Sequence, residues 1–594
     1  MTNWIKQYSV IALLLCYIIL FLGSFIYYPK YHRSGSEATI SWDVSGYYSY
    51  LPAVFIYGDL TQLNFLDSIV SKYHPTPDVQ QAFWYNENVR VFKYSCGQAL
   101  VFSPFFLVAH VYAINSNYPA DGFSTPYQFM ISVGMLLVAF LGLWFLRKVL
   151  LRFFSDKVTA ISLILLVFGT NYLEYASISF ALTHNTLFTV YSLLIFMIIR
   201  FYDKQTFVRA AIVGAIVGLT ILIRPTEMLS LLLPMLWGIS APFWKGFKER
   251  LAFFIVNYRY TLTMIFSCLL MGSIQLIYWK SVSGDWIVYS YGKQGFSFLA
   301  PHIYNATLSF RGGWLIYTPV MFFSLLGFVP LYRSNKNIFL ATLVFSLLFI
   351  YVAFSWDIWW YGASVGQRSM VQAYAVLCLP LAAFVDLVFN LQRIYKYVFI
   401  PLALLFIYLN ILLVHNAHYG GNYSAGSMTS AYYWRTFGKW TQDRNDKKLL
   451  DTNEDYRGKR NNIQQIFMIN LDSIDNGTKH NGILLRYKKQ TDKFFFSPPS
   501  NAAWLRAYAK IKLKGKEWNK WNMRKMEINF LGGDRVRKTR FIRIDRQFDN
   551  FEELEIYMDI KIPDKYDRVN IQFTNPGSKK ELVIRRIWIE SFNE

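Results

Sequence analysis

The stretch "SVIALLLCYIILFLGSFIYY", residues 9–28, decides the fold class of this 594-residue chain. It contains no charged residue and is long enough to cross about 30 Å of hydrocarbon as a helix. It is also longer than the apolar region of a cleavable signal peptide, which has about 7–15 residues. We therefore expect a retained membrane anchor that follows Lys6.

Apolar stretches of similar length recur along the first 415 residues. The whole sequence is 54% hydrophobic and 16% charged, far more apolar than a soluble enzyme of this size. This composition predicts a polytopic α-helical transmembrane domain over residues 1–415, with about eleven helices. The expected spans after the first lie at 127–147, 158–176, 184–201, 207–224, 226–243, 259–280, 314–332, 337–355, 369–389 and 395–415.

The distribution of positive charge decides the role of a further apolar stretch, 97–114. Counted as a span, it would export the basic segment 147–157, whereas a helix lying along the membrane keeps every short basic loop on the side of Lys6. We expect 97–114 to be interfacial or re-entrant and the N-terminus to be cytoplasmic. The loop 29–126 and the C-terminal domain are then external, which in a bacterial inner membrane means periplasmic.

The part of the chain after the last expected span has a different pattern. Alternation of apolar and polar residues predicts an external all-β sandwich, jelly-roll-like, over 461–594, after a linker at 416–460. Such a module resembles carbohydrate-binding domains, and either sugar binding or a structural, acceptor-orienting role would suit it. The expected strands lie at 504–513, 526–530, 553–562, 568–575 and 581–592.

This part of the chain is also strongly basic. Residues 431–594 hold 34 Lys and Arg against 22 Asp and Glu, which places a net +12 of the chain's +23 there. The basic residues form no recognisable nucleic-acid-binding motif, so we expect no nucleic acid as a partner. Attraction to membrane lipids or to phosphate-bearing substrates explains the charge more simply.

The external loop after the first span carries a lone carboxylate, Asp43, within "SWDVSGYYSYLPA" (41–53). An ordinary solvated acid is the plain alternative to a catalytic one. The tyrosines near it form either an interfacial aromatic belt or a wall that stacks against a sugar. Those taken as candidates for substrate contact are Tyr47, Tyr48 and Tyr94.

Cationic side chains are expected on the same face. The planar guanidinium of Arg368, in "DIWWYGASVGQRS" (357–369), suits a phosphate. Arg224 stands before a proline at the end of a span, where the alternative is a snorkelling arginine paired with a carboxylate such as Glu227. Lys93 is a third candidate cation. The remaining candidates for substrate contact are Glu227, His184, Trp359, Trp360 and Tyr361.

A single carboxylate beside arginines suits one reaction class in particular. A phosphate leaving group departs without a proton, so one general base suffices, and cations stabilise the charge that develops on the phosphate. These residues predict sugar transfer from a lipid phosphate. No cluster of His, Asp and Glu has metal-ligand spacing, so we expect no required cofactor, although a divalent metal is possible.

Four motifs together resemble the multi-spanning C-type (GT-C) glycosyltransferases, a superfamily that includes protein O-mannosyltransferases and lipid A aminoarabinose transferases. They are "WDVSGYY" (42–48), "KYSCGQALVFSPFF" (93–106), "IRPTE" (223–227) and "WWYGASVGQRS" (359–369). The resemblance implies Asp43 as the base, a polyprenyl-phosphate-linked sugar donor, inversion at the anomeric carbon, and a lipid, glycan or protein acceptor. Many relatives carry a second acid where this chain has Val44, which makes metal-assisted chemistry less expected here.

Two other functions remain open on the sequence. A transporter or flippase of a lipid-linked saccharide would place its polar residues near the bilayer midplane on broken helices, whereas the candidates here gather at one face. A non-catalytic envelope assembly factor that presents the β domain would tolerate replacement of Asp43.

Overall fold

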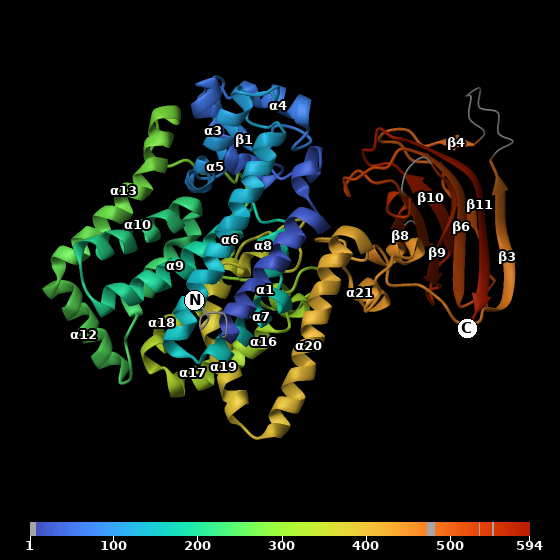
Figure 1. Ribbon diagram of the computed structural model, residues 1–594. Helices are drawn as coiled ribbons and strands as arrows, with labels where there is room; N and C mark the ends of the chain where they lie inside the picture. Colours follow the sequence, from blue (N-terminus) through green and yellow to red (C-terminus); the bar gives the residue numbers. More distant parts are fainter. Residues whose placement is uncertain (1–6, 472–481, 500, 534, 549–551) are drawn as a thin grey trace. The chain divides into compact units, whose positions relative to one another are not determined.

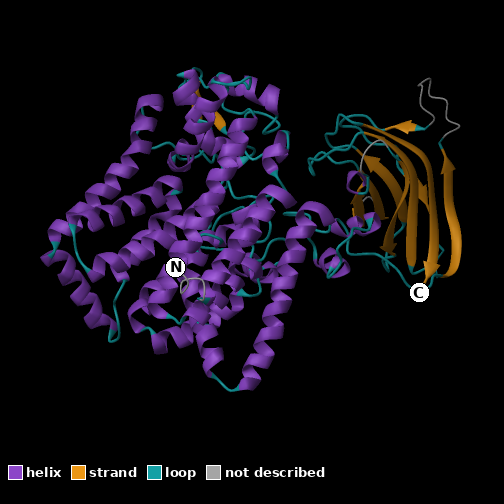
Figure 2. Cartoon of the chain, in the orientation of Figure 1, coloured by secondary structure: helices purple, strands orange, loops and turns teal. Residues whose placement is uncertain are grey.

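The computed structural model describes residues 7–471, 482–499, 501–533, 535–548 and 552–594, and the expected flanking Lys6 lies outside these ranges. The chain divides into two compact units, residues 1–419 and 420–594 (Figure 1). The first is almost entirely helical and the second is built of strands (Figure 2). The protein is therefore a polytopic α-helical membrane protein followed by an all-β domain.

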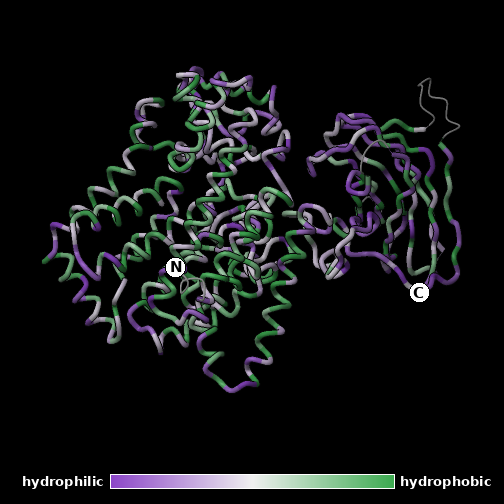
Figure 3. Tube along the Cα trace, viewed as in Figure 1, coloured by the Kyte–Doolittle hydropathy of each residue, from purple (hydrophilic) through white to green (hydrophobic). Residues whose placement is uncertain are grey.

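Seven helical stretches among the described residues are long and apolar enough to cross a membrane. Apolar residues line these helices along much of their length (Figure 3). The α9 stretch is the most buried of the seven, whereas the α13 stretch has few buried residues, as expected for a helix with one side toward lipid. The seven are Tyr8–His32, which begins with α1 (Tyr8–Leu22), α5 (Gly97–Ile114), α6 (Thr125–Phe153), α9 (Thr183–Asp203), α13 (Tyr258–Ser283), α18 (Lys336–Phe354) and Arg393–Gly420, which begins with α20 (Arg393–His415).

Shorter helices fill the remaining expected spans, so the count of eleven stays a prediction. The stretch 97–114 forms α5, whose length and composition would also permit crossing. Helix α12 (Phe243–Val256) precedes α13. The shorter apolar helices are α7 (Asp156–Gly169), α8 (Tyr172–Ser177), α10 (Phe207–Ile223), the 3₁₀ helix Pro225–Leu231 with α11 (Leu232–Leu236), and α19 (Tyr374–Asn390).

Several expected spans are not continuous helices, and 158–176 is divided into α7 and α8. In 226–243 the helix ends at Leu236, because Gly238 adopts a positive φ of 84° and donates its N–H to the carbonyl of Asn337. In 314–332 the chain forms three short helices, α15 (Trp314–Tyr317), α16 (Met321–Leu326) and α17 (Phe328–Ser334). A Cβ on Gly327, at the second break, would lie 1.8 Å from the carbonyl oxygen of Pro380, so this break allows α19 to approach closely.

The loop between α1 and α6 folds into a small layer with its own apolar core. It contains α2 (Asp43–Tyr48), α3 (Tyr50–Pro52), α4 (Phe65–Tyr73) and the hairpin of β1 (Ala82–Asn86) with β2 (Val89–Phe92), and it ends in α5. The tyrosines of α2 and α3 contribute to this core. The layer thereby fixes the start of α2, where Asp43 stands.

The second unit is a sandwich of two antiparallel sheets. One has the order β5-β10-β7-β8 and the other β3-β11-β6-β9, with β4 paired to β11, and apolar side chains from both sheets form one core. The expected strands are confirmed as β6 (Trp504–Lys514), β7 (Lys525–Gly532), β9 (Glu553–Lys561), β10 (Arg568–Thr574) and β11 (Glu581–Asn593). The others are β3 (Asn461–Asn470), β4 (Ile483–Leu484), β5 (Phe494–Phe496) and β8 (Arg535–Arg543).

The expected linker at 416–460 is partly ordered. It contains α21 (Ser430–Thr436) and the 3₁₀ helix Arg444–Leu450, and residues from 420 onward belong to the β unit. The boundaries at 415 and 460 stay predictions.

Candidate active site

A cavity of about 650 Å³ in the helical unit brings together most of the residues expected to act on a substrate. Its lining draws on the loop 29–126, the end of α10, the residues after α13 and the segment 356–372, which are far apart in the sequence. The expected site residues that line it are Asp43, Tyr47, Lys93, Tyr94, Arg224, Glu227, Tyr361 and Arg368.

Asp43 is the first residue of α2 and follows a strained residue. Trp42 has a φ of 48°, which a bulky side chain rarely adopts, and such strain persists only where the surrounding structure holds it. The Asp43 side chain keeps 29% of its surface accessible, and it lines the cavity. The carboxylate is thus held at a fixed place with one side open to a ligand.

Two side chains hold the Asp43 carboxylate by its two oxygens. The hydroxyl of Tyr94 donates to Oδ1 at 2.8 Å, and Nη2 of Arg368 lies 3.0 Å from Oδ2. Arg368 opens a short 3₁₀ helix, Arg368–Met370, after a loop in which Gly366 has a φ of 61°. A Cβ on Gly366 would lie 3.2 Å from the Tyr317 side chain, so glycine suits this position on both counts.

The charges around Asp43 keep it ionised. Burial raises the pKa of the carboxyl group, but the guanidinium of Arg368, the hydrogen bond from Tyr94 and the charges of Lys93 and Arg224 lower it more, and the pKa lies below its ordinary value. Burial and the adjacent Asp43 raise the pKa of Tyr94, so its hydroxyl retains the proton that it donates. Asp43 is therefore a deprotonated base at neutral pH.

Lys93 and Arg224 face the same cavity without a carboxylate partner. Neither forms an ion pair with any residue in the described ranges. The ammonium of Lys93 lies over the rings of Tyr94 and Tyr291, 5.5 and 5.6 Å from their centroids. Together with Arg368 they place three cations around a cavity whose carboxyl groups are Asp43 and the almost fully buried Glu227, an arrangement that favours an anionic ligand.

Aromatic side chains form part of the cavity wall. Tyr47 and Tyr94 are stacked with ring centroids 4.3 Å apart, and Tyr291 meets Trp356 edge to face at 5.3 Å. The sequence does not predict Tyr291 or Trp356 as site residues, because nothing in the loop after α13 or just after α18 distinguishes their side chains from an interfacial aromatic belt. These rings narrow the space beside the charged groups.

A buried hydrogen-bonded chain lies behind the charged wall. Tyr191 donates to Glu227 Oε2 at 2.6 Å, Gln372 Nε2 donates to Glu227 Oε1 at 3.1 Å, and Gln372 Oε1 lies 2.8 Å from His184 Nδ1. Glu227 and His184 are both almost fully buried. His184 therefore does not line the cavity but lies behind Gln372, whose side chain it can position. Gln372 is a lining residue that was not predicted from the sequence.

Three expected contact residues also lie outside the cavity lining. Tyr48 is buried, and its hydroxyl donates to the carbonyl of Gly122. Trp359 is buried against Trp360, and Trp360 is covered by the guanidinium of Arg311 at 3.5 Å. The structure therefore gives all three side chains packing contacts.

Much of the remaining cavity wall is apolar. This apolar part is contributed by the end of α10, the C-terminal half of α13, the loop after α13 and the end of α18. These residues continue toward the exposed apolar surface of α13. The apolar side chains of this wall include Leu222, Leu276, Trp279, Ile287, Phe349 and Val352.

Other carboxylates offer poorer alternatives. Asp357 accepts hydrogen bonds from the Gly295 N–H at 2.8 Å and the Ser297 hydroxyl at 2.7 Å, and it does not line the cavity. Glu87 lies exposed in the turn of the β1-β2 hairpin. Within the described ranges no three His, Cys, Asp or Glu side chains come together as metal ligands would.

Among protein-family models, curated sequences and solved structures, only the solved structures give matches to this chain. No protein-family model matches the sequence, and no curated protein sequence matches it. Two similar solved structures are ArnT from Cupriavidus metallidurans in the apo state and the arabinosyltransferase EmbB from Mycobacterium smegmatis. ArnT is 13% identical over 73% of this chain and 67% of its own, with a TM-score of 0.42. EmbB is 10% identical over 83% of this chain and 59% of its own, with a TM-score of 0.27.

Proposed function

We propose that this protein is an integral-membrane glycosyltransferase that moves a sugar from a polyprenyl-phosphate donor to an acceptor hydroxyl. The observation that carries the proposal is one ionised carboxylate, Asp43, in a cavity that also contains Arg368, Arg224 and Lys93. One base and several cations around a single space are what displacement of a phosphate leaving group requires.

The reaction needs a single proton acceptor. Asp43 takes the proton of the acceptor hydroxyl as that oxygen attacks the anomeric carbon, and a new carbon–oxygen bond forms. The bond from the anomeric carbon to the phosphate oxygen breaks, and its electron pair leaves with the polyprenyl phosphate. Attack on the face opposite the leaving group inverts the configuration of the sugar.

The cations would stabilise the departing phosphate. Arg224 and Lys93 have no ion-pair partner in the described part of the chain, and the buried Nε of Arg368 makes no hydrogen bond there. A donor phosphate would satisfy these groups. When it draws Arg368 toward itself, the attraction that lowers the pKa of Asp43 weakens, so Asp43 becomes a stronger base once the donor is bound.

The apolar wall suits the lipid part of the donor. Leu276 and Trp279 on α13 and Phe349 on α18 line the cavity beside the charged residues. Helix α13 has few buried residues and many exposed apolar ones, which would allow a polyprenyl chain to reach this wall from the bilayer.

The proposal includes a location and an orientation. The short basic loops support an orientation with the N-terminus in the cytoplasm and the candidate catalytic residues and the β unit outside a bacterial inner membrane. The acceptor is then a lipid, glycan or protein that carries a hydroxyl on the external side.

A direct test uses purified protein with radiolabelled polyprenyl-phosphate sugars and crude envelope acceptors. The proposal expects a labelled product that grows with the parent protein and stops with Asp43→Asn. Transport of the labelled donor across a vesicle membrane without any product would favour the flippase alternative instead.

A further inference from the structure

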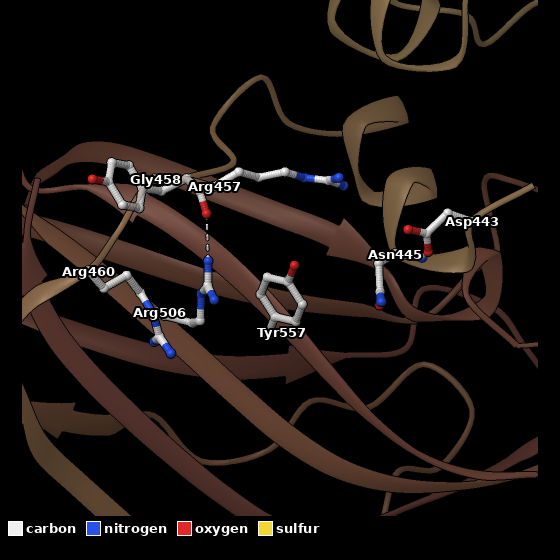
Figure 4. Close-up of a pocket in the computed structure, with 8 residues that line it drawn as sticks. Asp443, Asn445, Arg457, Gly458, Arg460, Arg506 and Tyr557 are labelled. Atoms are coloured by element: carbon white, nitrogen blue, oxygen red, sulfur yellow. Dashed lines mark hydrogen bonds between the residues drawn. The ribbon is translucent and has the colours of Figure 1, made fainter. Parts of the chain in front are cut away.

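The β unit has a polar cavity of its own, about 330 Å³ in volume. All of its lining residues belong to the unit 420–594. Strands β6 and β9 supply Arg506 and Tyr557, and the segment that precedes β3 supplies Arg460 at one end and Asn445 and Asp443 at the other (Figure 4). The cavity therefore lies between the outer face of a sheet and the chain that covers it.

The floor of this cavity is rigid. Arg506 holds Asp559 through two hydrogen bonds, from Nε at 2.6 Å and from Nη2 at 2.9 Å. The same Nη2 donates to the carbonyl of Tyr456 at 2.8 Å, which ties the covering segment to the sheet (Figure 4). The guanidinium also lies over the ring of Tyr557 at 4.4 Å. The cavity is thus formed before any ligand arrives.

Several polar groups on the wall remain available to a ligand. The hydroxyl of Tyr557 and the side-chain amide of Asn445 make no hydrogen bond to any residue within the described ranges. Arg460 binds Glu590 at 2.7 Å and Tyr508 at 3.2 Å through Nη1 alone, so Nε and Nη2 stay open among the described contacts. These groups include both donors and acceptors, and a polyhydroxylated ligand can satisfy both.

The charges on the wall narrow the class of ligand. Arg457, Arg460 and Arg506 line the cavity with one carboxylate, Asp443, and each arginine is also paired with a carboxylate outside the lining. Because Arg460 keeps Nε and Nη2 open among the described contacts, an anionic group is favoured beside Arg460. The Asp443 carboxylate would repel a ligand that is purely anionic, whereas it can accept a hydrogen bond from a hydroxyl. A sugar that carries a carboxylate supplies both features.

We propose that this cavity binds an acidic saccharide unit of a glycan, with its carboxylate at the open Nε and Nη2 of Arg460 and its hydroxyls at Tyr557, Asn445 and Asp443. The size of the cavity falls in the range of small-molecule sites, about 300–1,000 Å³. The basic character of the unit, +12 over 431–594, would attract such a glycan from solution. The inference does not depend on the reaction proposed for the helical unit.

The test measures binding of fluorescently labelled trigalacturonate to the full chain in lipid nanodiscs by anisotropy. Arg460→Gln should weaken binding about tenfold, and Tyr557→Phe, which removes one hydroxyl only, about threefold or more. The matched control is Arg586→Gln, the same change at an exposed position on β11 of the same sheet that does not line the cavity, and it should leave the affinity within about twofold. Asp43→Asn should bind as the parent does.

Two competitors check the class of ligand. Unlabelled maltotriose, which lacks a carboxylate, should compete at least about tenfold more weakly than unlabelled trigalacturonate, and inorganic phosphate at the same concentration should not displace the label. Absence of trigalacturonate binding, equal competition by maltotriose, full displacement by phosphate, or an equal loss in Arg460→Gln and Arg586→Gln would each overturn the proposal. Thermal unfolding of each variant establishes that it is folded.

Discussion

At the scale of single residues, the contact between Arg368 and Asp43 links the proposed base to the proposed donor site. Arg368→Lys keeps the charge but loses the planar fork, so donor affinity should fall about tenfold while the fold survives. Isothermal titration with a polyprenyl-phosphate sugar measures the change. Arg33→Lys, the same substitution outside the cavity lining, should bind the donor normally. Unchanged binding in an Arg368→Ala protein would remove this residue from the donor site.

The ionisation of Asp43 sets the acidic limb of the pH profile. The charge of Arg368 helps to hold the pKa of Asp43 below the ordinary value, so the carboxyl group is ionised at neutral pH. The titration of Asp43 should therefore leave kcat/KM unchanged above about pH 5. Activity should fall only as the pH falls through this lowered pKa. Arg368→Gln removes the attraction and raises the pKa of Asp43, so the acidic limb of the residual activity should move to higher pH. A limb that stays in place would contradict this coupling.

The sequence allowed Asp43, Arg368, Arg224 and Lys93 to be predicted as candidates, because charged residues next to a membrane need an explanation. It offered no such signal for Gln372, which gains its place only when α19 packs behind Glu227. The aromatic candidates were the least predictable. An aromatic residue near a membrane can pack in the protein, as Tyr48 and Trp359 do, or line a site, as Tyr47 does, and only the fold distinguishes the two.

At the scale of secondary-structure elements, the close contact of α5 with the end of α10 positions Arg224. A Cβ on Gly97, the first residue of α5, would lie 2.4 Å from the backbone nitrogen of Ile223. Gly97→Ala should therefore displace the end of α10, lower the thermal stability and reduce transfer by about tenfold or more. The control Gly272→Ala lies on α13, lines the same cavity and has open space at its Cβ position, so it should fold and act like the parent.

The breaks in the helices show where apolar patterns lose their predictive value. The pattern 314–332 reads as one span, yet the chain turns around Pro319 and at Gly327, because close packing against α19 requires it. In the β unit, alternation predicted the central strands well. Strand β8 was missed because it is an edge strand rich in arginine and lysine, a composition that discourages pairing with other chains.

At the scale of the whole molecule, the orientation in the membrane is the prediction that everything else requires. The proposal places the β unit outside and the turn after α6 inside. Half-buried Cys268 is first replaced by alanine, and a single cysteine is then introduced at Asn453 or at Lys148, both of which are exposed. In intact cells an impermeant maleimide should label the Asn453→Cys chain and fail to label the Lys148→Cys chain. Labelling of Lys148→Cys alone would place the candidate active site on the cytoplasmic side.

The central claim is that Asp43 removes the proton from the acceptor hydroxyl, and one comparison tests it most directly. Asp43→Asn keeps the size of the side chain and removes its basicity, so the rate of sugar transfer should fall by about 10²–10⁴-fold. Donor binding and thermal stability should stay close to those of the parent, and Asp357→Asn, outside the cavity lining, should transfer sugar normally. Transfer by Asp43→Asn at the parental rate would contradict the account, since the base would then be another group.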